Sequence, residues 1–245
     1  MNFPSSFIKN VLKKKDMTTL NLINEFLEKK EYDDTAYKHL TKNSWTDVSH
    51  DTGKRGEYEI YNYLKVFEDE GAVFLFNVYI PKPGEQTTEL DVVMIFKKGI
   101  IVLESKNYSG WIFGDATSKM WMQTLPLAKG KSFKKRFYNP ILQNKGHIDN
   151  LKKLLNRDVP IFSLIVFSER CTLKKVPENT NNTKIINRYN ITATVRKICE
   201  SNPDVIDSKE VHDIYRELYQ YSQVDEQTKQ KHINDIKNTH KYYRR

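Results

Sequence analysis

Cysteine and long apolar runs are scarce in this sequence, and each scarcity excludes a class of protein. Only Cys171 and Cys199 occur among 245 residues, with no Cys-x-x-Cys pair, so neither a disulfide framework nor a zinc ribbon is encoded. No segment approaches the ~18 consecutive apolar residues of a membrane-spanning helix, and the N-terminus has no apolar run of signal-peptide length. We therefore expect a reduced, cytoplasmic protein that makes no contact with membranes.

Several common catalytic motifs are absent as well. Gly130-Lys131-Ser132 has the form of the end of a P-loop, but Leu125 stands where the first glycine of that motif is required. The six histidines show neither a His-Glu-x-x-His motif nor a paired zinc spacing, and no Gly-x-Ser-x-Gly elbow is present. We interpret His147 as a helix-surface residue or as a neighbour of a site, in preference to a metal ligand.

The composition is that of a folded, basic protein. Apolar residues make up 38% and aromatic residues 12% of the chain, which is enough for a hydrophobic core. The net charge of +9 and the pI near 9.2 favour an acidic partner such as nucleic acid, because bound cations release counterions from phosphates. A lysine-rich surface without such a partner is the alternative interpretation.

The segment 89–110 is predicted to form a buried β-hairpin that charged residues interrupt. A two-residue turn at Lys98-Gly99 places Asp91 opposite Lys106 and Val93 opposite Glu104. A four-residue turn keeps this register, whereas a three-residue turn with a bulge changes it. The remaining positions are apolar on both faces, as in a strand between two helical layers. One face is expected to carry Leu90, Val92, Met94 and Phe96 with Ile101 and Leu103, and the other Val93 and Ile95 with Ile100 and Val102.

Three charged side chains of this hairpin share one face. Because side chains alternate along a strand, Asp91, Glu104 and Lys106 all project to the same side. Opposite residues lie about 5 Å apart and diagonal ones about 7–8 Å, so two carboxylates can converge on one cation. Carboxylates suit Mg²⁺, which Mn²⁺ can replace. Asp91 and Glu104 are therefore candidate metal ligands, and Lys106 is a candidate for assisting an attacking water in phosphodiester hydrolysis.

A helix expected after Thr52 offers a further acid. Glu57 shares one stripe with Ile60, Leu64 and Phe67, so it points toward the surface on which the helix packs. It could add a third carboxylate to the metal site. The alternative is an acid placed at a helix start because the helix dipole favours it there.

The segments around the hairpin predict a mixed order of helices and strands. Strands are expected at 72–80, 111–114, 120–125 and 161–167, and helices from Asn139-Pro140 to Leu155, at 191–200 and at 208–221. The N-terminal part carries an expected helix capped by Asp16 and a shorter one at 35–40, whose role is packing or partner contact. The polar tail from Asp225 forms a solvent-facing helix or a basic arm.

The segment from 129 to 136 is predicted to be a basic loop. It contains five basic residues and no acid, with aromatic residues nearby, so it could grip a phosphate backbone and stack bases. A solvated loop beside core aromatics is the alternative. The candidate nucleic-acid-binding residues are Lys129, Lys131, Lys134, Lys135 and Arg136.

The ordered motifs resemble a known family. Asp91 followed by Glu104-x-Lys106 resembles the PD-(D/E)XK nuclease superfamily, with Leu90 in place of the usual proline. A larger set resembles NERD, the nuclease-related domain of bacterial proteins, over about residues 50–155. That set comprises Gly53-x-x-Gly56-Glu57, Glu89-Leu90-Asp91, Gly99-Ile100, Glu104-Ser105-Lys106-Asn107 with Gly110, Trp121, and Asn139-Pro140-x-x-Gln143.

The resemblance implies a fold and a function. The fold is an α/β protein with a three-layer α/β/α restriction-endonuclease-like core and a mixed central sheet, flanked by N- and C-terminal helical segments. We expect a helical segment at 1–48, the nuclease-like core at 49–170 and a mostly helical extension at 171–245. The function is a Mg²⁺-dependent DNA nuclease in which Glu57 and Gln143 complete the catalytic site. A nucleic-acid-binding protein without catalysis, or an interaction scaffold, are the alternatives.

Overall fold

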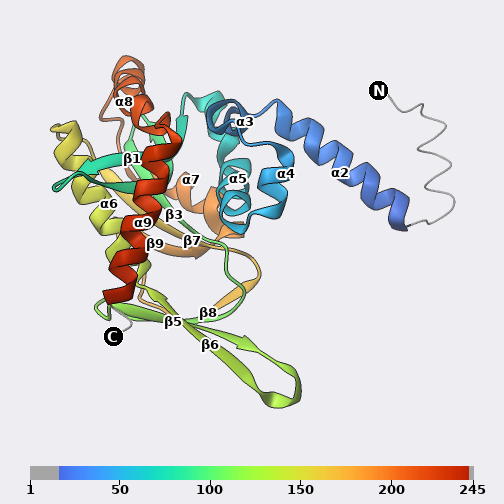
Figure 1. The fold of residues 1–245 in the computed structure, drawn as a ribbon. Coiled ribbons are helices and arrows are strands. Elements are labelled where there is room, and N and C mark those ends of the chain that lie inside the picture. The colour runs from blue at the N-terminus through green and yellow to red at the C-terminus, as the bar shows by residue number, and fades with distance from the viewer. Residues whose placement is uncertain (1–16, 243–245) are drawn as a thin grey trace.

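The computed structural model describes residues 17–242, and its centre is a mixed sheet between two layers of helices (Figure 1). The sheet has five strands in the order β1-β2-β3-β7-β9. The first three strands pair antiparallel, and the last two continue the sheet in parallel. The strands are β1 (Val73–Lys82), β2 (Gln86–Phe96), β3 (Gly99–Lys106), β7 (Ile161–Phe167) and β9 (Thr183–Asn187).

One helical layer covers the face that carries Phe76, Val92 and Leu103. Its main helix begins at Asp51, whose carboxylate accepts hydrogen bonds from the next backbone amides and so caps the helix. The layer contains α3 (Ala36–Thr41), α4 (Trp45–His50), α5 (Thr52–Leu64), the 3-10 helices η1 (Lys65–Glu70) and η3 (Arg188–Asn190), and α7 (Ile191–Ser201).

The opposite layer consists of α6 (Pro140–Leu155) and α8 (Ser208–Ser222), which cover Val93, Ile100 and Val102. The predicted start of α6 is confirmed, because the Asn139 side chain accepts a hydrogen bond from a backbone amide and a proline follows. The helices predicted at 191–200 and 208–221 are confirmed as α7 and α8. A last helix, α9 (Glu226–Tyr242), follows at the C-terminal end. The three layers and the mixed sheet are the architecture that the sequence predicts.

From residue 17 onward, the N-terminal part is helical, as predicted. The helix α2 (Met17–Asp33) projects from the body of the molecule (Figure 1), and its predicted cap, Asp16, lies outside the described residues. The shorter predicted helix is α3, capped by the Thr35 side chain. The helix α4 was not predicted; Ser44 and Asp47 form a reciprocal capping box at its start.

A second sheet with the order β6-β5-β4-β8 lies at one end of the molecule. The strands predicted at 111–114 and 120–125 are confirmed, but the basic loop predicted at 129–136 is wrong in form. Only its first residues turn, and the remainder is a strand that returns beside β5, because Phe133 and Phe137 pair with apolar β5 residues. The elements are β4 (Gly110–Phe113), β5 (Met120–Pro126), the 3-10 helix η2 (Ala128–Gly130), β6 (Ser132–Tyr138) and β8 (Cys171–Lys175).

The register of the central hairpin differs from the prediction. The turn lies at 97–98, and Phe96 pairs with Gly99 and Val92 with Leu103. The next step of this ladder places Asp91 across from Glu104 in place of Lys106. The reason lies in Gly99, which has φ 127° and whose added Cβ would stand 2.2 Å from the Pro160 carbonyl oxygen. Glycine is needed there because the segment that leads into β7 approaches its backbone closely, and not because of the turn.

The faces of the hairpin are predicted correctly except at Leu90. The positions from 92 to 96 and from 100 to 103 divide between the two clusters as expected, but Leu90 joins the cluster of Val93 and Ile95. The side chains change face at this point because Asn77, between two paired residues of β1, has φ 52°. This irregularity interrupts the alternation beside Asp91.

The C-terminal segment is built into the same sheets and hydrophobic clusters as the central part. The strand β9 joins the main sheet, β8 joins the second sheet, and α7 and α8 contribute to the two large hydrophobic clusters. The division at 48 and 170 stays a prediction. No helix among the described residues could cross a membrane, and Cys171 and Cys199 are both free thiols.

Candidate active site

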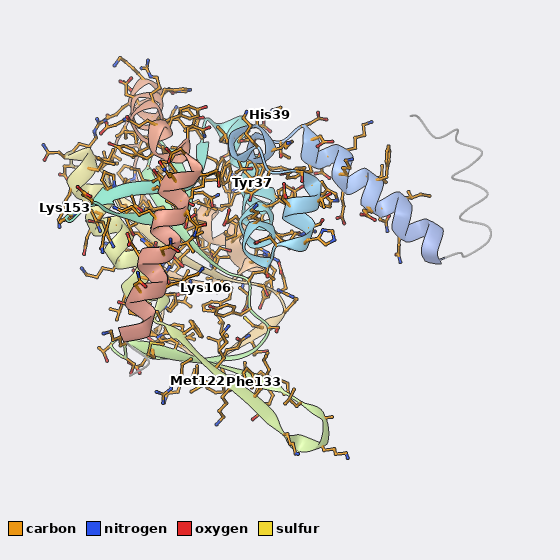
Figure 2. All side chains as sticks on the ribbon, viewed as in Figure 1. Tyr37, His39, Lys106, Met122, Phe133 and Lys153 are labelled. Atoms are coloured by element: carbon orange, nitrogen blue, oxygen red, sulfur yellow. The ribbon has the colours of Figure 1, made fainter. Side chains whose placement is uncertain are left out.

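Glu104 and Lys106 lie in contact at the end of β3. They are two residues apart in a strand, which places both on the face covered by α6. The Lys106 Nζ is 2.5 Å from Glu104 Oε1 and donates a second hydrogen bond to Gln143 Oε1 at 3.1 Å. Glu104 is only 1% exposed, so this carboxylate requires compensating partners. Three of the five predicted catalytic residues therefore meet directly, around the position of Lys106 in Figure 2.

Charges decide the protonation of this pair. Burial alone would raise the pKa of Glu104, but the Lys106 ammonium and His147 outweigh burial and lower that pKa. Burial disfavours the charged ammonium, yet the negative charge of Glu104 raises the pKa of Lys106. Glu104 is therefore a carboxylate and Lys106 an ammonium group at neutral pH.

His147 contacts Glu104, a partner that the sequence did not specify. It is buried on α6, and its Nε2 lies 3.2 Å from Glu104 Oε2, without the geometry of a hydrogen bond. Its Nδ1 lies 2.5 Å from Thr88 Oγ1. The spacing of four residues from Gln143, one helical turn, was the available signal. His147 is thus a buried neighbour of the site, and the interpretation as a helix-surface residue is wrong.

Asp91 lies where the ladder between β2 and β3 ends. Its Oδ2 accepts a hydrogen bond of 2.8 Å from the backbone amide of Ser105, so a side chain takes the place of a backbone partner. Burial raises the pKa of Asp91 well above its usual range, and the negative charges of Glu104 and Glu57 add to the effect. Asp91 and Glu104 therefore repel each other unless a proton or a cation intervenes.

Glu57 points from α5 toward the sheet, as its position on the apolar stripe predicts. Its Oε2 accepts hydrogen bonds from Asn77 Nδ2 at 2.9 Å and from the Tyr37 hydroxyl at 3.2 Å. Burial raises the pKa of Glu57 to about 8, against the effect of these two hydrogen bonds. Tyr37 comes from the N-terminal segment, for which packing or partner contact was expected. That segment therefore reaches a candidate site residue.

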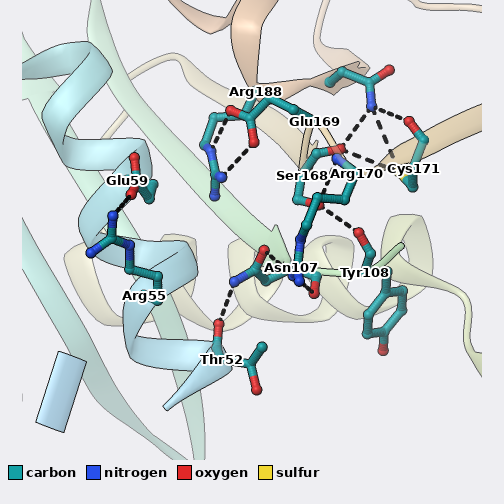
Figure 3. Close-up of polar contacts among 11 residues, drawn as sticks. Thr52, Arg55, Glu59, Asn107, Tyr108, Ser168, Glu169, Arg170, Cys171 and Arg188 are labelled. Carbon is teal, nitrogen blue, oxygen red and sulfur yellow. Dashed lines mark hydrogen bonds and ion pairs between the residues drawn. The ribbon is translucent and has the colours of Figure 1, made fainter. Parts of the chain in front are cut away.

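Close packing of α5 on the end of β3 explains part of the glycine motif. A Cβ on Gly56 would stand 2.7 Å from Ser105 Oγ and 3.0 Å from the Cβ of Asn107. Asn107 in turn donates a hydrogen bond to the Thr52 carbonyl, and its own carbonyl and side-chain oxygens accept hydrogen bonds from Arg170 (Figure 3). Gly56 thus permits the contact that holds Glu57 beside the strand.

The C-terminal helix α9 lies against the first part of β2, the part that also carries Thr88 and Asp91. His232 is buried there, with Nδ1 2.9 Å from Thr87 Oγ1 and Nε2 3.5 Å from Glu89 Oε2. Burial lowers the pKa of His232. Residues 226–242 of the tail thus form a helix attached to the core.

The predicted nucleic-acid-binding residues lie apart from the carboxylates. All five occur on the hairpin formed by β5 and β6, which extends away from the body of the molecule (Figures 1 and 2). The base of this hairpin leads directly into α6, which carries Gln143 and His147. The basic residues are therefore connected to the site along the chain, through α6, but they are not part of it.

The donor atoms suit a hard cation. Among the described residues, no group of three or more His, Cys, Asp or Glu side chains is arranged to hold a metal ion. Mg²⁺, however, commonly uses only one or two carboxylates and keeps several waters. Glu104 Oε2 is buried beside His147 without a hydrogen-bond partner, so it is an oxygen acceptor that a cation could satisfy. The residue types present fit such an ion, and the roles of Asp91, Glu104 and Glu57 as its ligands stay predictions.

The comparisons with known proteins concern the same part of the chain. Residues 52–168 match the family model described as nuclease-related domain, NERD, a segment that contains every predicted site residue. A similar protein is an uncharacterized protein of Bacillus anthracis, 30% identical over 187 residues, which cover 76% of this chain and 84% of the relative. No solved structure matches the chain.

Proposed function

Because the chain belongs to the nuclease-related domain family, we propose that it is a metal-dependent nuclease that hydrolyses phosphodiester bonds of DNA. The observation that supports this most directly is the contact of 2.5 Å between Glu104 and Lys106, with the carboxylate of Asp91 close enough to be perturbed by Glu104. A carboxylate pair beside an ammonium group is suited to bind a cation and a phosphate together.

Each residue has a separate part in this proposal. Asp91 and Glu104 would hold Mg²⁺ or Mn²⁺, and Glu57 would supply a third carboxylate once a bound cation offsets the burial that raises its pKa. A bound divalent cation neutralises charge on a phosphate oxygen and lowers the pKa of water. Lys106, as an ammonium group, donates hydrogen bonds to the attacking water or to the phosphate. Gln143 accepts a hydrogen bond from Lys106 and so restricts where that ammonium group points.

The proposal is tested with linear, circular and single-stranded DNA in the presence of Mg²⁺, Mn²⁺ or a chelator. The variants are Glu104→Gln and Lys106→Met, with the exposed residues Glu178→Gln and Lys153→Met as matched controls. We expect cleavage that needs the metal and falls by a factor on the order of 10²–10³ in each site variant, while the controls cleave normally. Full activity in both site variants, with folding intact, would contradict the assignment.

A nucleic-acid-binding protein without catalysis is the second candidate. The observation that favours it is the lack, among the described residues, of a cluster of three metal-binding side chains. This candidate predicts salt-sensitive DNA binding with no cleavage in either metal. The same set of measurements therefore separates the two functions.

A further inference from the structure

The hairpin of β5 and β6 is a two-stranded ribbon that projects beyond its own sheet. The strand β4 pairs with β5 only as far as Thr124, whereas the pairing of β5 with β6 continues to Pro126 and Ser132. From Thr124 to Leu127 the chain advances three steps, about 10 Å at ~3.4 Å per residue. The free part of the ribbon is therefore close to the depth of a DNA major groove, about 8.5 Å, and a two-stranded ribbon fits the groove's width of about 12 Å.

The ribbon carries positive charge without compensation. No acidic residue occurs between Asp115 and Asp149, and the residues of β6 from 132 to 136 are all exposed. Within the described part of the chain, none of the five basic side chains of the hairpin forms an ion pair: Lys129, Lys131, Lys134, Lys135 and Arg136. These charges are available to phosphates.

The cations lie on both faces of the ribbon. Paired residues of two strands share a face, and Lys135 pairs with Gln123 whereas Lys134 pairs with Thr124 and Arg136 with Met122. Successive residues alternate, so Lys135 lies on one face and Lys134 and Arg136 on the other. A single strand lying along the ribbon would meet one face. The two phosphate backbones that border a duplex groove would meet both.

The end of the ribbon is apolar as well as basic. Leu127 is 55% and Phe133 is 53% exposed, and Figure 2 shows Phe133 on the projecting hairpin, farther toward its tip than Met122. Lysines on an edge strand also prevent strands of different molecules from pairing. Protection of the edge strand does not explain the lysines of the turn, which lie outside the strand. It does not explain the large exposed apolar side chains either, because these favour association between protein molecules. Contact with the edges of stacked bases explains both.

The base of the ribbon is tied to the site. Asn139 Nδ2 donates hydrogen bonds to the carbonyl oxygens of Asp115, Ala116 and Ser118, and Asn139 Oδ1 caps α6. The same helix carries Gln143, which contacts Lys106. The direction of the ribbon and the position of Lys106 are therefore fixed relative to each other.

We propose that the β5–β6 ribbon enters the major groove of duplex DNA, contacts the phosphates of both strands with its two faces, and so selects duplex as the substrate. The choice of nucleic acid as occupant rests on the proposed nuclease function. DNA is favoured over duplex RNA because the major groove of A-form RNA is too deep and narrow for such an element.

Binding is measured in a chelator, where cleavage does not occur, with a short DNA duplex, the matching RNA duplex and single-stranded DNA. The ribbon variant combines Lys134→Ala, Lys135→Ala and Arg136→Ala. Its control removes the same charge elsewhere through three exposed lysines: Lys29→Ala, Lys30→Ala and Lys153→Ala. A further variant is Phe133→Ser.

We expect the wild-type protein to prefer duplex DNA. The ribbon variant lowers the slope of log affinity against log salt by about 2.7, from three lost phosphate contacts at about 0.9 each, and the control keeps the slope. Phe133→Ser weakens duplex binding at an unchanged slope, because an apolar contact releases no counterion. An unchanged slope in the ribbon variant, or equal binding of single strands or of RNA duplex, would overturn the proposal.

Failure of the nuclease function gives a different result. A protein that binds duplex DNA through the ribbon but does not cleave it in Mg²⁺ or Mn²⁺ retains the groove contact and loses the catalytic assignment. If the protein cleaves DNA and the ribbon variants bind duplex DNA normally, the catalytic assignment is kept and the groove contact is overturned.

Discussion

His147 Nε2 lies 3.2 Å from Glu104 Oε2, and neither atom has a hydrogen-bond partner. On the other side of the ring, Nδ1 lies 2.5 Å from Thr88 Oγ1. When the ring carries its proton on Nε2, Nδ1 accepts a hydrogen bond from the Thr88 hydroxyl and the Nε2–H group lies beside Glu104. Thr88 and His147 are thus placed to orient the carboxylate that is expected to hold metal.

Replacement of His147 by alanine should weaken the site without abolishing it. Loss of a group that orients a metal ligand costs roughly 10–100-fold in metal affinity or activity, less than loss of Glu104 itself. The measurement is the Mg²⁺ dependence of DNA cleavage, with Lys153→Ala on the same helix as the control. Thr88→Ala should shift the Mg²⁺ dependence in the same direction, and Thr88→Ser should restore it. A His147→Ala variant with wild-type Mg²⁺ dependence would refute this role.

Replacement of Gly99 by alanine should destabilise the protein strongly. The new Cβ would stand 2.2 Å from the Pro160 carbonyl oxygen, in a backbone with φ 127°. Gly71 is a matched control, because its φ is 86° but nothing lies within 4 Å of an added Cβ. We expect Gly71→Ala to cost about 1–2 kcal/mol from the left-handed backbone alone and Gly99→Ala a further ~1–3 kcal/mol. Urea unfolding measures both, and equal losses would contradict the clash.

The faces of the central hairpin can be predicted from the sequence because side chains alternate along each strand, and all apolar side chains on one face belong to the same hydrophobic cluster. A shift of the turn by one residue changes each partner by two positions, so Glu104 and Lys106 keep the same face although the register is wrong. The change of face at Leu90 could not be predicted in this way, because it depends on the backbone of Asn77 in another strand.

Contacts between distant segments were beyond the reach of sequence patterns. Tyr37 and Glu57 are twenty residues apart in the sequence. The periodicity of a short helix does not indicate that one of its tyrosines donates a hydrogen bond to another element. The basic segment was recognised by composition, but its form was not. Three consecutive basic residues separate Phe133 from Phe137, which is not an alternating pattern, so the strand becomes clear only once Phe137 is paired with Trp121.

Replacement of Tyr37 by phenylalanine should destabilise the protein through Glu57. The hydroxyl is buried and lies 3.2 Å from both the Lys54 carbonyl oxygen and Glu57 Oε2, so its loss leaves buried acceptors with fewer donors. We expect a cost of roughly 1–3 kcal/mol in the free energy of unfolding. Tyr189→Phe, at a residue 58% exposed, should change it by less than about 0.5 kcal/mol. Similar values for the two variants would argue against the buried hydrogen bond.

Glu57 should make the metal-free protein less stable as pH rises. Burial raises its pKa to about 8, from an ordinary value of 4.5, so the folded state binds a proton more tightly than the unfolded state does. The stabilisation is complete below pH 4.5 and is lost as pH increases through about 8. Melting temperatures in a chelator should therefore fall across this window, and Asp91, whose pKa is also raised, should add to the fall. Glu57→Gln should reduce the slope, whereas Glu178→Gln should leave it as in the wild type. An undiminished slope in Glu57→Gln would mean that Glu57 is already ionised in the folded protein.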